Sequence, residues 1–158
     1  NAPDGRGITI DETDPDYGIV GESRNYTYDS ICRAARCVNN GARLIGTNTD
    51  LTAPTEWGQV PACRALVAPI ELATGKEAYY VGKPNPLMMR TGLNLLGVHS
   101  QYTAIIGDRM DTDIVAGIET GLDTLLVLSG VTTREELAHY PYRPRLVLDG
   151  VGDIPPQE

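Results

Sequence analysis

The sequence is short of cysteine, of basic residues and of long apolar runs, and each shortage excludes a class of protein. Its three cysteines, Cys32, Cys37 and Cys63, are odd in number and form no Cys-x-x-Cys or Cys/His pattern. Neither a disulfide framework nor a zinc site is therefore expected, and the reduced thiols of a cytoplasmic protein are the simplest interpretation. No apolar run is long enough to span a membrane, and no signal peptide is visible.

Positive charge is scarce as well, because 13 lysine and arginine residues stand against 21 acidic ones, for a formal net charge of -8. An acidic surface repels nucleic-acid phosphates and anionic lipids. We therefore expect neither nucleic acid nor a membrane as the main partner. A small anionic substrate would still bind where basic groups and a metal ion are concentrated locally.

The pattern that is present is an alternation of short apolar runs and amphipathic segments. The 158 residues are 41% hydrophobic, which is enough for one ordinary domain or two small ones. The alternation predicts an α/β fold with a mainly parallel sheet. Strands are expected at residues 17–20, 43–47, 78–81, 104–106, 123–128 and 145–148, helices at 27–39, 62–74, 86–96, 112–121 and 134–140, and a long polar loop at 48–61.

The most informative stretch is residues 103–113, where a short apolar run is followed by a tight acidic turn. Asp108, Asp111 and Asp113 lie in this turn, and Thr112 is expected to cap the following helix. Ligands bind at the carboxyl ends of strands in an open parallel sheet, and clustered carboxylates suit Mg²⁺. The alternative is a capped helix start with solvated acids, because aspartate is favourable near a helix N-terminus.

A second strand end strengthens the metal interpretation. The motif Gly-Lys-Pro-Asn-Pro (82–86) follows a short apolar run, and its two prolines stiffen the backbone at the start of the next helix. Lys83 is thereby placed at a strand-to-helix junction, the same kind of place as Asp108. An ammonium group beside a metal-binding carboxylate can neutralise charge on a transferring phosphate. The two residues together indicate phosphate chemistry, whereas Lys83 alone would be an ordinary turn lysine.

These motifs resemble those of haloacid dehalogenase (HAD) superfamily phosphatases of the NagD and p-nitrophenylphosphatase type. The resemblance rests on Gly-Lys-Pro-Asn-Pro (82–86), Gly-Asp-Arg-Met-Asp-Thr-Asp-Ile (107–114) and Leu-Val-Leu-Ser-Gly-Val (126–131), with Asn-Gly-Ala-Arg (40–43) and Thr-Asn-Thr-Asp (47–50) upstream. It implies an α/β fold in two parts. Residues 1–77 would be most of an inserted α/β cap, and residues 78–158 would be the C-terminal half of a HAD-like core, a partial Rossmannoid parallel sheet.

The resemblance also implies roles for individual residues. Lys83, Asp108 and Asp113 would be catalytic. Asp108 and Asp113 would form the Mg²⁺ site, with Asp113 supporting it from just behind, while Lys83 would neutralise the nucleophile and bind the phosphate. Asn48 and Asp50 would contact a small phosphorylated substrate from the cap.

One motif of such enzymes is not found in this sequence: the Asp-x-Asp-Gly strand whose first Asp becomes phosphorylated and whose second acts as acid and base. Asp4-Gly5 lacks the apolar strand that would precede it, and the chain begins with Asn1 rather than Met. We therefore expect a fragment, the latter part of such an enzyme, that is inactive alone because covalent catalysis needs the nucleophile. Residues 103–106 would then present an unpaired apolar strand edge, which favours a homo-oligomer.

The expected function of the full-length parent is Mg²⁺-dependent hydrolysis of a small phosphate monoester, a nucleotide monophosphate or a sugar phosphate, through an aspartyl-phosphate. A non-catalytic phosphate- or metal-binding or regulatory module from a truncated relative is the first alternative. A phospho-receiver domain is the second. In such a domain the lysine follows the phosphoacceptor strand, whereas Lys83 precedes Asp108.

Overall fold

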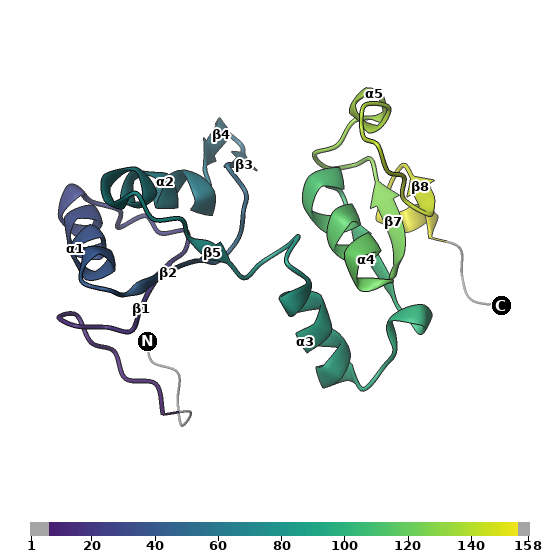
Figure 1. Ribbon diagram of the computed structural model, residues 1–158. Coiled ribbons are helices and arrows are strands. Elements are labelled where there is room, and N and C mark those ends of the chain that lie inside the picture. Colours follow the sequence, from purple (N-terminus) through teal and green to yellow (C-terminus); the bar gives the residue numbers. More distant parts are fainter. Residues whose placement is uncertain (1–6, 155–158) are drawn as a thin grey trace. The chain divides into compact units, whose positions relative to one another are not determined.

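The computed structural model describes residues 7–154 and divides into two compact units, with the division between Val81 and Gly82 (Figure 1). The sequence had placed this division after residue 77. The later position follows from β5 (Tyr79–Tyr80), which pairs with β2 (Arg43–Gly46) of the first unit. None of the helices between residues 7 and 154 combines the length and the apolar character that a membrane span requires.

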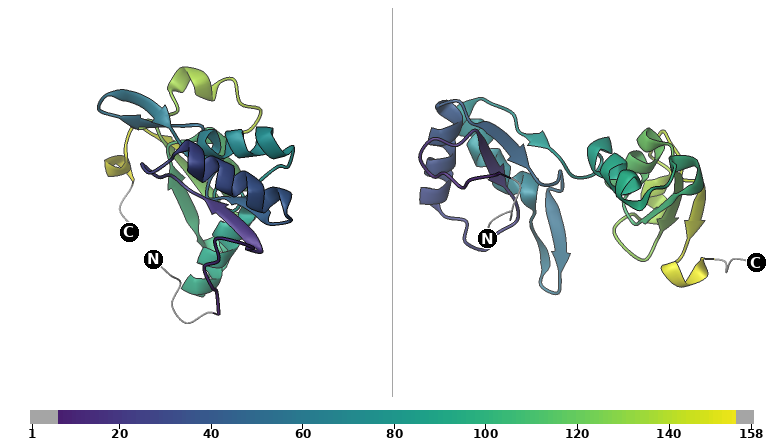
Figure 2. Two further views of the ribbon diagram at one scale, coloured as in Figure 1. Left: turned by 90° about the vertical axis from the view of Figure 1, so that its left-hand side faces the viewer. Right: turned by 90° about the horizontal axis from the view of Figure 1, so that it is seen from below.

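The first unit is a small parallel sheet covered by two helices. Its elements are β1 (Tyr17–Val20), α1 (Tyr28–Asn39), β2 (Arg43–Gly46), β3 (Thr52–Thr55), β4 (Gly58–Pro61), α2 (Cys63–Thr74) and β5 (Tyr79–Tyr80). The sheet has the order β1-β2-β5, and α1 and α2 pack on one of its faces (Figure 2). The core between them consists of Val38, Leu44, Cys63, Val67 and Ile70.

Residues 48–61 do not form the long polar loop that the sequence suggested. They contain the antiparallel hairpin β3–β4. Its tight turn is closed by the Thr55 hydroxyl, which donates to the C=O of Gly58 (2.8 Å) and accepts the N–H of Trp57 (3.3 Å). The sequence prediction was wrong because proline and glycine, here Pro54, Gly58 and Pro61, are depleted in strands generally, whereas a two-stranded hairpin consists only of edges that tolerate them.

The second unit repeats the parallel arrangement. Its elements are α3 (Pro86–Leu96), β6 (Ala104–Gly107), a π-helical turn (Met110–Ile114), α4 (Val115–Thr120), β7 (Asp123–Val127), α5 (Arg134–Leu137), β8 (Leu146–Leu148) and two 3-10 turns (Ser100–Tyr102 and Val151–Asp153). The sheet has the order β6-β7-β8 with parallel pairing throughout. Met110, Ile114 and Leu126 form its core. The mainly parallel α/β fold expected from the sequence is thus confirmed.

Local sequence signals set most helix ends. Thr27 caps α1, because its hydroxyl accepts the N–H of Ser30 at 3.2 Å. Asn85 caps α3, which has Pro86 in its first turn and ends at Gly97 in the left-handed conformation (φ 67°). These boundaries agree with the sequence-based prediction.

The expected cap at Thr112 is wrong. Thr112 is buried inside the π-helical turn, and α4 begins only at Val115. The wider turn arises because the N–H of Ile114 donates to the C=O of Arg109 (3.1 Å), five residues back. A π turn of this kind leaves no local sequence signature, so the sequence alone could not distinguish it from an ordinary helix start.

Candidate active site

Asp113 is a buried carboxylate that connects the parts of the predicted site. Only 4% of the residue is exposed. Its Oδ1 lies 2.5 Å from Nζ of Lys83, and its Oδ2 accepts the backbone N–H groups of Asp108 (3.2 Å) and Arg109 (3.1 Å). A buried carboxylate is costly unless its charge is paired and its oxygens are hydrogen-bonded, and here both conditions hold. Asp113 thereby holds the Lys83 ammonium beside the turn that carries Asp108.

The segment before α3 presents Lys83 to this carboxylate. The N–H of Asn85 donates to the C=O of Gly82 (3.0 Å), which closes a turn around Lys83, and the Asn85 side chain then caps the helix. The Lys83 side chain remains 38% exposed. The Lys83 side chain is therefore anchored by Asp113 and still partly accessible to solvent.

Gly107 ends β6 at a close approach to Asp113. A Cβ at this position would lie 2.2 Å from Cγ of Asp113, far inside van der Waals contact. The strand can therefore reach the carboxylate only with glycine at its last position. This close approach sets where the next residue, Asp108, leaves the sheet.

Asp108 is half-buried at the carboxyl end of β6. Its Oδ2 accepts the N–H of Val131 (2.8 Å), and no other hydrogen bond to this carboxylate occurs within residues 7–154. Asp111, the third acid of the turn, is exposed and binds Arg109, whose Nε and Nη2 donate to its two oxygens (3.1 and 2.9 Å). The three acids thus have different partners and do not form one cluster.

The positions and partners of these acids limit which of them could hold a cation. No three His, Cys, Asp or Glu side chains converge on one point anywhere in the described part of the chain. Mg²⁺ usually keeps several waters and is held by one or two carboxylates together with substrate phosphate. Asp108 fits such an ion as a hard oxygen ligand. The oxygens of Asp113 are already engaged by Lys83 and two N–H groups, so Asp113 suits a supporting position.

Asn48 and Asp50 lie together in the first unit, directly after β2. The Asn48 side-chain oxygen accepts the N–H of Asp50 (3.1 Å), and the C=O of Asp50 accepts the N–H of Arg64 (3.0 Å) at the start of α2. The turn is thereby fixed at the carboxyl end of β2, the edge at which parallel sheets bind ligands.

Thr132 was not singled out by the sequence, although it contacts the acidic turn. It is buried (5% exposed), its hydroxyl accepts the N–H of Met110 (3.1 Å), and its N–H donates to the C=O of Asp108 (2.9 Å). The motif at 126–131 ends one residue earlier and signalled only the family. A contact between segments so far apart in the sequence has no local signature.

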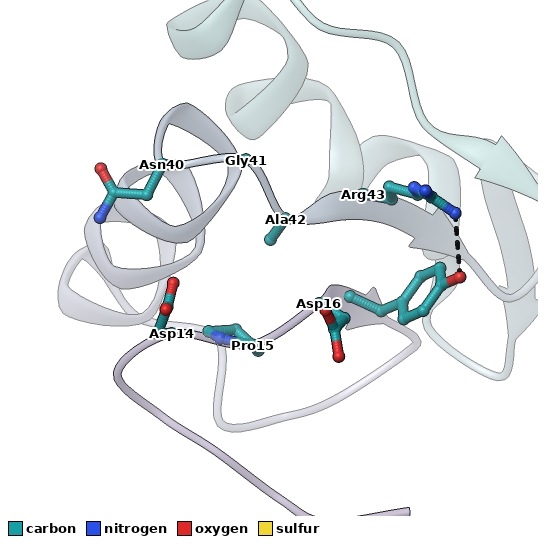
Figure 3. Close-up of a pocket in the computed structure, with 8 residues that line it drawn as sticks. Asp14, Pro15, Asp16, Asn40, Gly41, Ala42 and Arg43 are labelled. Atoms are coloured by element: carbon teal, nitrogen blue, oxygen red, sulfur yellow. Dashed lines mark hydrogen bonds between the residues drawn. The ribbon is translucent and has the colours of Figure 1, made fainter.

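A polar hollow lies at the other end of the first unit's sheet (Figure 3). It is lined by residues 14–17 and 40–43, which precede or begin β1 and β2. Nη1 of Arg43 donates to the hydroxyl of Tyr17 (3.1 Å) at its side. Because parallel sheets bind ligands at their carboxyl ends, we do not assign the hollow to the candidate site.

Several known proteins that are similar to this chain in sequence and fold are named phosphatases. Residues 80–154 match the family described as HAD-hydrolase-like. The chain is 45% identical over 148 residues to dihydroxyacetone phosphatase of Corynebacterium glutamicum and to ribonucleotide monophosphatase NagD of Escherichia coli. These alignments cover 94% of the chain and 54% and 58% of the two relatives, so the chain spans little more than half of their length.

Solved structures give the same result. NagD of E. coli K-12 superposes with a TM-score of 0.86 at 44% identity and covers 94% of this chain and 58% of its own. The 4-nitrophenylphosphatase of Thermotoga maritima superposes with a TM-score of 0.87 at 34% identity and covers 92% and 56%. Family match, sequence identity and fold agree. The chain belongs to the haloacid dehalogenase superfamily, in the group that contains NagD and the p-nitrophenylphosphatases.

Proposed function

We propose that the protein is a Mg²⁺-dependent phosphatase that hydrolyses small phosphate monoesters, either nucleotide monophosphates or sugar phosphates. The names of its relatives, a ribonucleotide monophosphatase, a dihydroxyacetone phosphatase and acid sugar phosphatases, support this class of substrate. The observation that carries the proposal is the buried Asp113, which holds the Lys83 ammonium beside the turn that carries the Asp108 carboxylate.

Each of these residues has a distinct task in the proposed reaction. Lys83 binds a phosphate oxygen and offsets negative charge as the phosphoryl group transfers. Asp108 contributes an oxygen ligand to Mg²⁺, and the bound ion would supply further charge neutralisation. Asp113 keeps Lys83 and the main chain of Asp108 in place. The nucleophile of such enzymes belongs to an Asp-x-Asp-Gly strand, a motif that residues 1–158 do not contain.

The first unit would then be the greater part of the cap, and the second unit part of the hydrolase core. Asn48 and Asp50 are proposed to contact the substrate, because they follow the carboxyl end of β2 in a fixed turn. The hairpin that comes next carries Trp57 at its tip with 89% exposure. An aromatic side chain in that position could contact the organic part of a monoester.

Self-association of the chain is a further part of the proposal. Within residues 7–154, β6 pairs only with β7, and Ile106 of β6 is 45% exposed. An apolar strand edge of this kind favours pairing with a second chain. Sedimentation of residues 1–158 should show an oligomer, and Ile106→Lys should convert it to a monomer. An unchanged oligomer in the variant would assign the contact to another surface.

The test of the enzyme uses the complete gene product that contains residues 1–158. Hydrolysis of p-nitrophenyl phosphate, AMP and a sugar phosphate is measured as Mg²⁺ is titrated. Asp108→Asn should lower turnover at least about 100-fold, because it removes an electrostatic contact made in the transition state. Asp111→Asn is the matched control, since Asp111 is exposed and binds only Arg109 among the described residues, and it should stay within about twofold of wild type.

The possible outcomes separate the two candidate functions. Equal rates and equal Mg²⁺ half-saturation in wild type and Asp108→Asn would contradict the assignment of Asp108. No turnover in the wild-type product, combined with retained Mg²⁺ or phosphate binding, would identify a non-catalytic binding module instead. Turnover that requires Asp108 would establish the enzyme.

A further inference from the structure

The turn that follows β7 contacts Asp108. This turn, residues 130–132, approaches the acidic turn in two ways. The N–H of Val131 donates to the carboxylate Oδ2 of Asp108 (2.8 Å), and the N–H of Thr132 donates to its C=O (2.9 Å). Asp108 is therefore held both at its side chain and at its main chain by a single short segment.

Gly130 makes the contact closer than any other residue type would allow. A Cβ at this position would lie 2.0 Å from Oδ2, 2.4 Å from Cβ and 2.5 Å from Cγ of Asp108. Because the clash includes the Cβ, which the main chain fixes, rotation of the carboxylate alone cannot relieve it. Gly130 has no positive φ, so alanine fits its backbone conformation and the obstacle is the Asp108 side chain.

Thr132 fixes the same turn from inside the core. It is 5% exposed, and its hydroxyl accepts the N–H of Met110, a fully buried residue, at 3.1 Å. The acidic turn and the turn after β7 are thus joined at both Asp108 and Met110. The joint involves main-chain groups and one buried hydroxyl, so its geometry is rigid compared with that of a surface side chain.

We propose that the turn 130–132 is a positioning element that sets the orientation of the Asp108 carboxylate for its cation. The proposal rests on the proposed function, which makes Asp108 a Mg²⁺ ligand. The N–H of Val131 holds Oδ2 of Asp108, so Oδ1 would be the oxygen left to bind the ion. Outer groups that orient a metal ligand typically change metal affinity about 10- to 100-fold when they are removed.

The experiment compares two Gly→Ala substitutions in the same unit of the complete gene product. Gly130→Ala inserts a methyl group against Asp108, whereas Gly92→Ala inserts one in α3 where nothing lies within 4 Å. Mg²⁺ affinity is measured directly by calorimetric titration, and melting temperature is recorded without the ion. Gly130→Ala should weaken Mg²⁺ binding roughly 10- to 100-fold. Gly92→Ala should leave it unchanged.

A second pair of variants keeps the proposal testable if Gly130→Ala does not fold. Thr132→Val removes the hydroxyl that accepts the Met110 N–H and should weaken Mg²⁺ binding, whereas Thr132→Ser retains the hydroxyl and should restore it. In addition, the loss of melting temperature caused by Gly130→Ala should shrink when Asp108 is replaced by glycine. That result would show that the inserted methyl group meets Asp108 itself.

The outcomes distinguish this inference from the proposed function. If Asp108→Asn abolishes Mg²⁺ binding but Gly130→Ala and Thr132→Val lower only the melting temperature, the turn is structural and the positioning role is refuted. If Asp108→Asn itself leaves Mg²⁺ binding unchanged, the metal assignment fails and the positioning role fails with it. Weakened binding in Gly130→Ala, with rescue in Thr132→Ser relative to Thr132→Val, supports both.

Discussion

In both units a strand ends at a glycine that lies against a side chain, but the side chain differs between the two units. Each contains three parallel strands, and in each a strand ends at a glycine, Gly46 of β2 and Gly107 of β6. A Cβ on Gly46 would lie 2.4 Å from the ring of Tyr80, and a Cβ on Gly107 would lie 2.2 Å from Cγ of Asp113. The glycine admits an aromatic ring in the first unit and a carboxylate in the second.

The consequences for the two strand ends differ accordingly. The Tyr80 ring packs against the apolar core of the first unit, and burial, with the nearby Glu71 charge adding to it, raises the pKa of Tyr80 to about 12. Asp113 instead brings the Lys83 ammonium to the end of β6. The same backbone geometry therefore completes a core in one unit and builds an electrostatic site in the other. Side-chain chemistry, not the path of the strand, makes the difference.

The largest expected effect is the loss of turnover in Lys83→Ala, compared with Lys76→Ala in the first unit. Lys83→Ala should lower turnover about 100-fold or more, because the ammonium is proposed to offset charge in the transition state. It should also cost about 1–3 kcal/mol of folding free energy, since the buried Asp113 loses a partner. Kinetics and thermal melting of the complete gene product measure both.

Lys76→Ala is the matched control in the first unit. Nζ of Lys76 donates to the C=O of Val38 in the last turn of α1 (2.7 Å). This contact stabilises a helix end and has no proposed part in phosphate transfer. Turnover should stay unchanged, and the melting temperature should fall only slightly. Normal turnover in Lys83→Ala, or equal losses in both variants, would return Lys83 to the role of a turn residue.

A smaller effect is expected from the two strand-end glycines themselves. Gly107→Ala should cost about 2–3 kcal/mol of folding free energy, because Asp113 is held by three polar contacts and cannot move aside. Gly46→Ala should cost about 1–2 kcal/mol, since the half-buried ring of Tyr80 lies on the edge strand β5 and can shift. Urea unfolding of both variants gives the comparison, and the reverse order would show that the carboxylate site is the more adaptable of the two.

The sequence predicted those features whose causes are local. Thr27 and Pro86 mark helix starts through hydrogen bonding and fixed φ, and apolar runs mark the parallel strands. The sequence placed Lys83 and Asp108 each after a strand, but these strands, β5 and β6, belong to different sheets, and it is Asp113 that contacts both residues. What these features share is a signal within a few residues of the position concerned.

Most of the features that the sequence did not predict depend on distant partners. Thr112 sits in a π turn instead of capping a helix, because the packing of Met110 and Ile114 into the core sets the turn. The contact of Thr132 with Met110 joins segments that follow different strands. The β3–β4 hairpin was hidden by residues that strands seldom contain. Tertiary packing determined the outcome for Thr112 and Thr132, whereas the hairpin is a local pairing that its composition concealed.

The smallest expected effect again contrasts the two units, through their helix caps. Both α1 and α5 begin with a reciprocal capping box, Thr27 with Ser30 in the first unit and Thr133 with Glu136 in the second. The N–H of Thr133 donates to the Glu136 carboxylate (2.8 Å), and this hydrogen bond lowers the pKa of Glu136 below its usual 4.5. The box in the first unit contains no titratable group, so only the second should depend on pH.

The sign of that dependence follows from the direction of the pKa shift. Because the pKa of Glu136 is lower in the folded protein than in the unfolded chain, its contribution is complete above pH 4.5 and is lost as the pH falls through the folded value. The melting-temperature difference between wild type and Glu136→Gln should therefore shrink as the pH is lowered from 7 to 3. The difference for Ser30→Ala should stay constant over the same range. A constant difference for Glu136→Gln would mean that the carboxylate charge adds nothing to the cap, and the two boxes would then be equivalent.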